Sequence, residues 1–594
     1  MANITYGALI DAASQVVAVG EPYGINAAGT DLIVTSPDYG VAAYSSGDIA
    51  WLLTCTALVW LMIPGVGSVA VPNLRRLRSQ PDAVCGATRP AADLSTHLLL
   101  ATCIQGTLCR RKNALTVLTL TMLCMGIVSF QVSLASVGDV GSSGVSLTRS
   151  DLLKLCVVAD RFEWHPRPGY SLAFSPTGGP FLGDLHFFVL RNVAEQPVPQ
   201  ANNKVPQIVY MIYQNMFAAL VPAVFIGAAA ERGRVLPACI FFFCWSTVVY
   251  CPVAHWIWAP EGWAFKLGVL DYAGGGPIEI CSGVTGLVYS IFLGKRRGFG
   301  TPLLAFKPHN VSYVIQGTIF LWVGWLGFNG GSTFAANFKA AFAIVNTNLA
   351  ASFGGLAWML IDYRLERKWS VVGYCTGAIC GLVAITPAAG YVGPAAAIFI
   401  GVIAAAISNL LTTLKGIFNF DDAMDIYACH GVAGIVGLVF TGVFAEAAYT
   451  GNDGYSTASG WIEKNYIQVG YQLGYICAVW GYTFVMCFAL MFLINLIPGC
   501  KFRVDENQEI VGTDDAELGE WAYDYVVKRR DIEAPDELRN YHNQSMVERP
   551  LAEIARLDGN SSSVETAITP PSETTASNAL EKSVPVGKTE EVRD

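Results

Sequence analysis

The chain contains 594 residues, of which 53% are hydrophobic and only 14% are charged, and its mean hydropathy is +0.43. Because soluble chains carry about a quarter charged residues, this composition excludes an ordinary soluble protein and indicates a large apolar surface in contact with lipid. The formal net charge of −9 comes without a basic stripe, which argues against a nucleic-acid partner.

Residues 1–48 contain no long apolar run, and we interpret them as an extracellular N-terminal segment. After them, eleven segments reach the length of about 20 mostly apolar residues that a membrane-spanning helix needs. These segments are too continuously apolar for barrel strands. We therefore expect an all-α polytopic membrane domain over 49–498, with helices at 49–66, 114–135, 205–228, 237–257, 276–294, 310–330, 338–362, 371–388, 393–414, 426–446 and 470–498.

Lys and Arg are concentrated in alternate loops between these predicted helices, and such residues favour the cytoplasmic side. The loops after the odd-numbered helices contain Arg110, Arg111, Lys112, Arg232, Arg234, Lys295, Arg296, Arg297, Arg364, Arg367, Lys368, Lys415, Lys501 and Arg503. The other loops contain few, chiefly Lys266, Lys339 and Lys464. The pattern predicts that the N-terminus lies outside the cell and the C-terminus in the cytoplasm.

The chain changes character after the last predicted helix. Residues 499–545 are charged with some aromatic residues, and we interpret them as a cytoplasmic C-terminal region with a short helix against the membrane domain. Residues 546–594 are rich in Ser, Thr, Glu and Pro, which is typical of a disordered tail.

The 16 cysteines are scattered through apolar segments. They form no CxxC pair and no Cys/His spacing of the kind that binds metals. We interpret them as small apolar core residues, and we predict neither a metal nor a cofactor.

The fifth and tenth predicted helices share one pattern. Asp271 precedes Glu279 by eight residues, and Asp422 precedes His430 by eight. In both segments glycines follow at +4 and +7 from the ionisable residue, and then Leu-Val-aromatic. Because the two segments are five spans apart, the halves run in opposite directions. This predicts an inverted repeat of five plus five spans, with the pore between the halves.

Glu279 and His430 occupy matching positions of this repeat. An ionisable side chain inside a span is costly and points to function. The alternative is a structural pair whose hydrogen bonds are satisfied locally. The shared position in both halves favours a functional pair inside the pore.

Aromatic residues gather near the outer ends of three predicted helices. They are in the segments 213–219 and 325–332 and at Trp258. Aromatic faces together with a hydroxyl oxygen suit a small cation that donates hydrogen bonds. Taken singly, each aromatic residue is more typical of the belt at a membrane interface. Their common depth is what favours a cation site.

Longer motifs resemble the ammonium transporter (Amt/Mep/Rh) family, and its fungal Mep branch in particular. They are GDIAWLLTCTALVWLMIPGVG at 47–67, RRKNAL at 110–115, YQNMFAALVPAVFIGAAAERGR at 213–234, LDYAGG at 270–275, GWLGFNGGS at 324–332 and ACHGVAGIVG at 428–437. The resemblance implies a homotrimer in the plasma membrane, with a pore in each subunit that carries ammonium or ammonia, and also methylammonium. The partners it implies are this substrate and the lipid bilayer.

The resemblance also assigns roles to individual residues. Trp258, Phe217 and Ser332 match the outer site that recruits ammonium, and Asp271 matches the aspartate that supports it. Phe217 and Phe328 match the stacked gate below that site.

Glu279 and His430 match the family's twin-histidine positions deep in the pore. The chain departs here from the commonest pattern, because the first histidine is a glutamate. The resemblance implies that the two residues relay a proton after ammonium is deprotonated at the gate.

Two stretches, 68–109 and 132–168, interrupt the resemblance. One interpretation is insertion in loops at the ends of spans, where insertions are tolerated. The other, which we favour, is translated introns. Val132-Ser133 is compatible with a splice-donor sequence, and Gln105 is compatible with a terminal CAG.

The sequence therefore predicts an ammonium transporter and not an enzyme, because no nucleophile–base pair or phosphate loop stands out. The alternative is an ammonium sensor or transceptor that signals through the cytoplasmic tail. A non-functional product is a third possibility if both unusual stretches are translated.

Overall fold

The computed structural model describes residues 17–20, 23–25, 31–36, 40–66, 108–133, 169–187, 190, 192–301, 308 and 310–523. All of them belong to the first of two compact units, residues 1–529. The predicted tail at 546–594 and nearly all of the stretches 68–109 and 132–168 lie outside the described residues.

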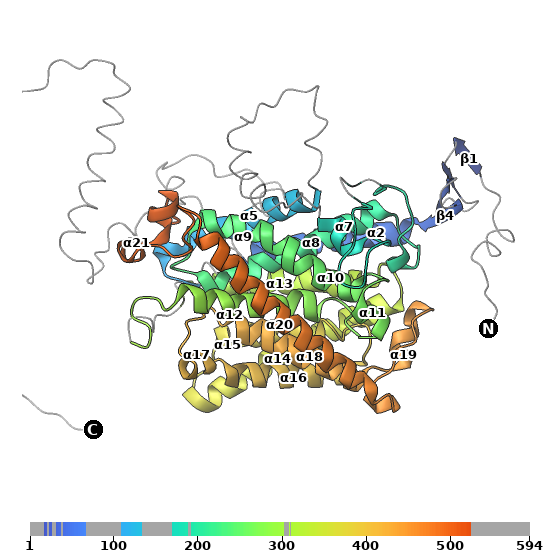
Figure 1. Cartoon of the computed structure of the whole chain (residues 1–594). Helices are drawn as coiled ribbons and strands as arrows, with labels where there is room; N and C mark the ends of the chain where they lie inside the picture. The colour runs from blue at the N-terminus through green and yellow to red at the C-terminus, as the bar shows by residue number, and fades with distance from the viewer. Residues whose placement is uncertain are drawn as a thin grey trace, which may run out of the picture. The chain divides into compact units, whose positions relative to one another are not determined.

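Helices make up most of the described chain (Figure 1). The α-helices are α2 (Ser46–Val66), α5 (Ala114–Ser133), α7 (Gly169–Phe174), α8 (Gln207–Phe225), α9 (Val235–Trp245), α10 (Cys251–Trp258), α11 (Trp263–Leu267), α12 (Cys281–Leu293), α13 (Val311–Gly331), α14 (Phe338–Glu366), α15 (Val371–Ile385), α16 (Pro394–Leu411), α17 (Leu414–Ile417), α18 (Ala433–Phe444), α19 (Ala447–Thr450), α20 (Ile467–Asn495) and α21 (Glu506–Val511). Four π-helical segments are η7 (Ser246–Tyr250), η8 (Gly275–Ile280), η10 (Tyr427–Val432) and η13 (Asp514–Leu518).

Each of the eleven predicted spans corresponds to a helix or to a run of joined helices. Ten of these in the described chain are long and apolar enough to cross a membrane. The remaining one, α15, is apolar but has 15 residues. It ends at Ile385 rather than at the predicted 388 because Pro387 follows, and proline cannot continue a helix without losing a backbone hydrogen bond. The count of eleven spans therefore remains a prediction, whereas the polytopic helical fold is confirmed.

A small sheet precedes the first helix and lies outside the all-α membrane domain expected over 49–498. Its antiparallel strands are β1 (Val17–Gly20), β2 (Tyr23–Ile25), β3 (Asp31–Ser36) and β4 (Gly40–Ser45), paired in chain order. In the longest pairing Asp31 lies opposite Ser45. The Tyr44 hydroxyl donates a hydrogen bond to the Glu195 carbonyl, which ties the sheet to the loop before α8.

The helix packing follows the predicted repeat. The first half contains α2, α5, α8, α9–α10 and η8–α12, and the second contains α13, α14, α15, α16 and η10–α18. The contacts of α5 with α8 and α9 match those of α14 with α15 and α16. Likewise, α2 packs on α8 as α13 packs on α15. The last span, α20, stands outside the repeat and packs against α9, α12 and α18, running obliquely across the view in Figure 1.

The two halves meet where α12 crosses η10 and α18 crosses η8. A Cβ on Gly283 would lie 2.1 Å from the Gly431 backbone nitrogen, and one on Gly434 would lie 2.8 Å from the Glu279 Cβ. Both glycines hold the +4 position of the repeat pattern. They let each helix approach the π-helical segment of the other half.

Buried ion pairs join four chain segments on the face where α5 begins. The Glu231 carboxylate accepts from Arg110 Nε at 3.1 Å and from Arg296 Nη1 at 3.3 Å. Arg296 also donates from Nε to Asp421 Oδ2 at 2.8 Å. Two of the basic residues that predicted the orientation, Arg110 and Arg296, are thus held in one network at this face.

The C-terminal segment 499–523 is attached to the same face. Asp514 Oδ2 accepts from the Leu115 amide at 2.9 Å, and its Oδ1 accepts from the Thr116 amide at 2.7 Å. These are among the first amides of α5, which lack partners within the helix. A carboxylate there both caps the helix and interacts favourably with its dipole.

The glycine crossing generates the first prediction. Gly283→Ala should destabilise the protein by about 1–3 kcal/mol or more, because the new methyl group meets backbone rather than a mobile side chain. The matched control is Gly126→Ala in α5, where no atom lies within 4 Å. Thermal unfolding of both purified variants is the measurement. Equal midpoints in the two would contradict the role given to this crossing.

The attachment of the C-terminal segment generates the second prediction. Asp514→Ala should weaken docking by about 0.5–2 kcal/mol, the usual cost of losing a helix cap. Limited proteolysis should then cut 499–523 faster than in the wild type. Asp515→Ala, beside it, is the control and should leave the rate unchanged; faster cleavage in both variants would argue against a specific cap.

Candidate substrate pathway

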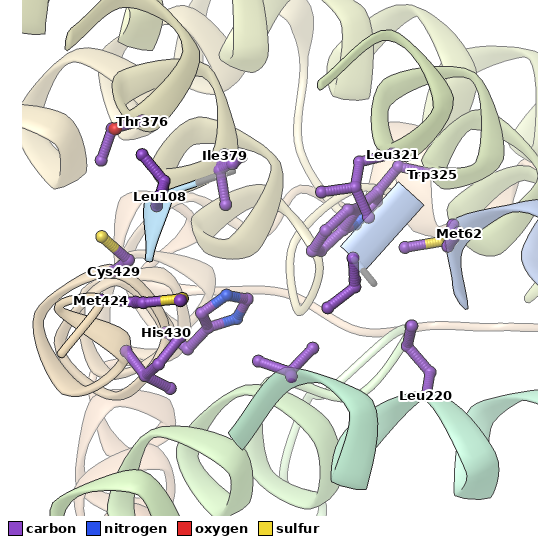
Figure 2. Close-up of a pocket in the computed structure, with 13 residues that line it drawn as sticks. Met62, Leu108, Leu220, Leu321, Trp325, Thr376, Ile379, Met424, Cys429 and His430 are labelled. Atoms are coloured by element: carbon purple, nitrogen blue, oxygen red, sulfur yellow. The ribbon is translucent and has the colours of Figure 1, made fainter. Parts of the chain in front are cut away.

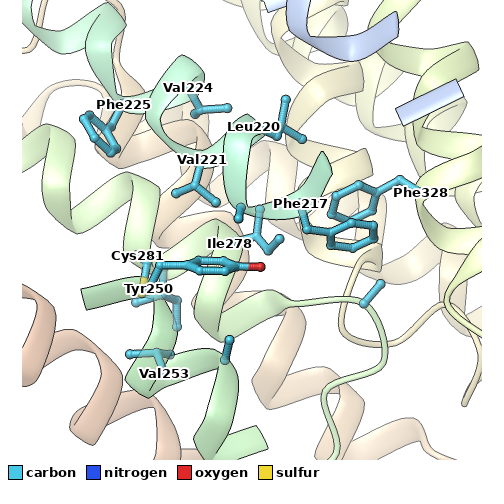
Figure 3. Packing of buried hydrophobic residues seen from close by; sticks show 14 of the residues in the cluster. Phe217, Leu220, Val221, Val224, Phe225, Tyr250, Val253, Ile278, Cys281 and Phe328 are labelled. Atoms are coloured by element: carbon cyan, nitrogen blue, oxygen red, sulfur yellow. The ribbon is translucent and has the colours of Figure 1, made fainter. Parts of the chain in front are cut away.

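Two stacked phenylalanine rings form the centre of the aromatic cluster that the sequence predicts. Phe217 of α8 and Phe328 of α13 have ring centroids 4.2 Å apart and planes 16° apart. Figure 3 shows them face to face, with Ile278 nearby. Both side chains are buried, so the rings close the space between α8 and α13.

Trp258, the last residue of α10, lies beside this stack. Its ring meets Phe217 edge to face, with centroids 6.1 Å apart. On another side it faces Phe174 of α7 at 6.5 Å with nearly parallel planes. Unlike the two phenylalanines, Trp258 is only partly buried, so part of the indole remains open to a ligand.

Ser332 lies one turn after Phe328, where α13 ends. Its hydroxyl donates to the Phe328 carbonyl at 2.7 Å and lies 3.3 Å from the Tyr213 hydroxyl. Tyr213 also donates to the Phe328 carbonyl at 2.7 Å, and its ring lies 4.8 Å from that of Phe217. With its proton engaged, the Ser332 oxygen is left as an acceptor. Tyr213 belongs to a motif quoted above, but its positioning role was not predicted.

Asp271 does not face this cluster directly. Its carboxylate accepts from the amides of Gly274, Gly275 and Gly276 at 2.6–2.9 Å. These bonds organise the turn that begins η8, and a Cβ on Gly274 would lie 3.1 Å from Trp258. Asp271 therefore shapes the backbone against which Trp258 rests.

Glu279 and His430 meet where the repeat halves cross. His430 Nδ1 lies 2.9 Å from Glu279 Oε2, and both side chains are buried. Each sits in a π-helical segment, η8 or η10, a distortion that often marks functional positions. Glu279 Oε1 has no hydrogen-bond partner within the described part of the chain, so the pair retains a free acceptor.

A cavity of about 70 Å³ borders His430. We call it the His430 cavity. Trp325 lines it and lies 5.5 Å, ring to ring, from Phe328, so the stacked rings and the cavity are one tryptophan apart. In Figure 2 Met424, Cys429 and His430 lie together at one end, with Met62 and Leu220 at the other.

The predicted residues thus form two groups joined through Trp325. The first group contains Trp258, Phe217, Phe328 and Ser332, beside the turn that Asp271 caps. The second group is the pair of Glu279 and His430. The first offers aromatic faces and a hydroxyl oxygen, which suit a small cation. The second offers a buried acid–base pair that can hold a proton. The lining of the His430 cavity was not predicted, because it comes from separate helices.

The capping by Asp271 can be tested by comparison with Asp422, which holds the matching position of the repeat. Within the described part of the chain, Asp422 makes two such bonds, to the amides of Met424 at 3.4 Å and Tyr427 at 2.9 Å. Asp271→Ala should lower the thermal midpoint more than Asp422→Ala, because it removes three hydrogen bonds to a charged group rather than two, and each such bond is worth about 1.5–3 kcal/mol. An equal or smaller loss in Asp271→Ala would contradict this account.

Comparisons with known proteins agree with this arrangement. The profile of the Ammonium Transporter Family matches residues 122–523. Ammonium transporter 1 of Schizosaccharomyces pombe is 43% identical over 81% of this chain and 83% of its own length. Ammonium transporter MEP1 of Saccharomyces cerevisiae is 46% identical over 61% and 74%. The crystal structure of Saccharomyces cerevisiae Mep2 is 38% identical and has a TM-score of 0.65, covering 83% of this chain and 93% of that one. The chain therefore belongs to the ammonium transporter family.

Proposed function

We propose a route by which this multi-pass membrane protein transports ammonium across the plasma membrane. The ion is recruited at Trp258, Phe217 and Ser332, loses a proton at the Phe217–Phe328 gate, and continues as ammonia past Glu279 and His430. The observation that carries the proposal is the buried Glu279–His430 pair, 2.9 Å between Oε2 and Nδ1, at the crossing of the two halves.

Recruitment rests on the partly exposed Trp258 ring and the free acceptor of Ser332. A cation on an aromatic face gains about 0.5–2 kcal/mol, depending on how far it is desolvated. Ammonium also donates hydrogen bonds, and Ser332 provides an oxygen within the same cluster. A neutral solute would gain the hydrogen bond without the electrostatic attraction.

The apolar lining of the space beyond the gate favours deprotonation of the ion at the gate. Leu220, Trp325 and other apolar side chains line the His430 cavity, and a charge in such surroundings is costly. Splitting ammonium into ammonia and a proton lets the neutral molecule cross this wall. The proton passes to the Glu279–His430 pair, whose Oε1 is the open acceptor.

We also propose that the N-terminus lies outside the cell, that the C-terminal segment is cytoplasmic, that methylammonium is carried, and that three subunits each contain a pore. The basic residues gathered at the face of the C-terminal segment support this orientation. The sensor function, by contrast, is not favoured, since the relatives are named as transporters.

The proposal predicts that Glu279→Ala abolishes most transport. Uptake of labelled methylammonium should fall by about ten-fold or more. Without the Glu279 carboxylate, His430 would have to hold the released proton alone, as a positive charge in apolar surroundings, which is costly. Uptake is measured in cells without other ammonium transporters, after normalising for protein at the membrane.

Two further variants separate chemistry from packing. Glu279→Gln keeps the shape but cannot take up the proton, so its uptake should also fall. Glu279→His restores the family's commonest pattern and should retain uptake. If a well-expressed Glu279→Ala variant takes up as much methylammonium as the wild type, the proposed route is wrong.

A further inference from the structure

One lysine is buried although the proposed transport route does not use it. Lys339 lies in the first turn of α14, and only 4% of its surface is exposed. Its side-chain ammonium group donates to Asp453 Oδ2 at 2.7 Å, and the Asp453 side chain is buried as well. Burying two charges costs desolvation that an apolar pair avoids. Stability alone therefore does not explain why these two residues are here.

Two tyrosine rings complete the surroundings of this side-chain ammonium group. Its nitrogen lies 5.1 Å from the centroid of the Tyr391 ring and 5.9 Å from that of the Tyr272 ring, within the range of a cation–π interaction. The two rings meet edge to face at 5.6 Å. The Ser456 hydroxyl lies 3.4 Å from the nitrogen. We call Lys339, Asp453, Tyr272 and Tyr391 the Lys339 cluster.

Asp453 closes a short 3-10 turn, η11 (Gly451–Asp453), that follows α19. Its Oδ1 accepts from the amides of Tyr455 at 3.0 Å and Ser456 at 2.8 Å. Burial raises the pKa of Asp453, but the hydrogen bonds from Lys339 and Ser456 lower it more, so the pKa lies below its ordinary value. The group is therefore a carboxylate at neutral pH, and it holds the loop after α19 against the start of α14.

Tyr272 connects the Lys339 cluster to the turn that begins η8. It directly follows Asp271, whose carboxylate caps that turn. The Tyr272 amide donates to the Pro387 carbonyl at 3.1 Å, and a Cβ on Gly390 would lie 2.4 Å from the Tyr272 ring. The ring is thus held by the loop between α15 and α16 as well as by the side-chain ammonium group of Lys339.

The same loop supports the gate. The Thr386 carbonyl accepts from the Ala273 amide at 3.2 Å, and the Thr386 hydroxyl accepts from Trp325 Nε1 at 2.8 Å. Trp325 in turn lies 5.5 Å from Phe328 of the stacked pair, ring to ring. A shift of the chain at 271–273 would therefore be passed on toward the stacked rings.

The start of α14 also lies close in sequence to Ser332. Asn337 caps α14 by accepting from the Ala340 amide at 3.0 Å. The Thr333 hydroxyl donates to the same Asn337 oxygen at 3.1 Å. Because Lys339 fixes the first turn of α14, the short segment before that helix joins a fixed point to Ser332.

We propose that Lys339 is a positioning residue for recruitment: it fixes the turn at Asp271 and the segment after Ser332 relative to each other. This inference rests on the function proposed above. Lys339 does not touch the substrate in this role. Because it holds the recruitment site in place without taking part in the proton relay, its loss should weaken binding and leave the later steps intact.

Lys339→Met tests the role through methylammonium uptake in cells without other ammonium transporters. The apparent KM should rise about ten-fold, since misplacing a binding group by about 1 Å can cost up to about a hundred-fold. The maximal rate per protein at the membrane should stay within about two-fold of the wild type, because only binding shared by the bound and transition states is lost.

Lys266→Met is the matched control for this measurement. Lys266 is also paired with a carboxylate, that of Glu261, but its side chain is 52% exposed. Its loss should leave both the KM and the maximal rate unchanged. If Lys339→Met has the same KM as the wild type, or if Lys266→Met raises the KM equally, the positioning role is wrong.

A double variant separates position from charge. If charge mattered instead, the unpaired Asp453 carboxylate left in Lys339→Met would attract ammonium and lower the KM. Lys339→Met combined with Asp453→Asn removes both charges, so that no unpaired charge is buried. Its KM should rise as in the single variant, and it carries the test if the single variant does not fold. A double variant with the KM of the wild type would overturn the positioning role.

Hydrogen–deuterium exchange of the purified full-length protein measures positioning without transport. In the double variant, peptides covering 271–276 and 332–337 should exchange faster than in the wild type, whereas peptides of α5 should not. Equal exchange at 271–276 and 332–337 would show that Lys339 does not hold these segments. A wild type without saturable uptake would instead refute the proposed function, and the exchange rates would still decide whether Lys339 fixes the two segments.

Discussion

The close crossing of the two repeat halves is the constraint on which the rest of the structure depends. Gly283 lies so near the Gly431 backbone that even a methyl group would not fit. The reciprocal position, Gly434, lies against Glu279. Because lipid offers no hydrophobic drive for helices to associate, such small residues allow the van der Waals contact that holds the halves together. The same contact brings Glu279 within 2.9 Å of His430. The contact between the halves and the Glu279–His430 pair thus depend on the same crossing. A residue larger than glycine at Gly283 or Gly434 would push the two halves apart and would also separate Glu279 from His430.

From this crossing, the order of polar and apolar surroundings follows. Asp271 holds the turn before η8 through three backbone amides, so the segment carrying Glu279 begins at a fixed place beside Trp258. Phe217 and Phe328 then stack next to that tryptophan, and Trp325 links the stack to the His430 cavity. In the proposed route, a solute leaving the partly exposed tryptophan meets buried rings before it meets an ionisable group. This order favours recognition of charge first and removal of charge afterwards.

Much of this could be predicted from the sequence, for physical reasons that differ between features. Long apolar runs predict helices because lipid leaves the backbone no other partner. The spacing of Asp271, Glu279 and the glycines predicted a repeat, since the same pattern returns around His430. The strands before α2 were missed because they are short and carry little alternation. The end of α15 was placed too late because Pro387 lies inside an apolar run. The lining of the His430 cavity has no local signal, because its residues come from helices that are far apart in the sequence.

Glutamate at the position where the resemblance implies a first histidine changes the charge of the pair. Two imidazoles carry no charge without an extra proton and one positive charge with it. Glu279 and His430 carry one negative charge without the shared proton and none with it, wherever that proton sits between Oε2 and Nδ1. Each state is thus one unit more negative than in a pair of histidines. A pair that becomes neutral on protonation avoids a net positive charge in the apolar interior, where isolated charge is most costly. Before protonation the negatively charged pair attracts a cation or a proton, and after protonation the neutral pair no longer does. This suits the proposed relay, which must accept a proton and then pass it on.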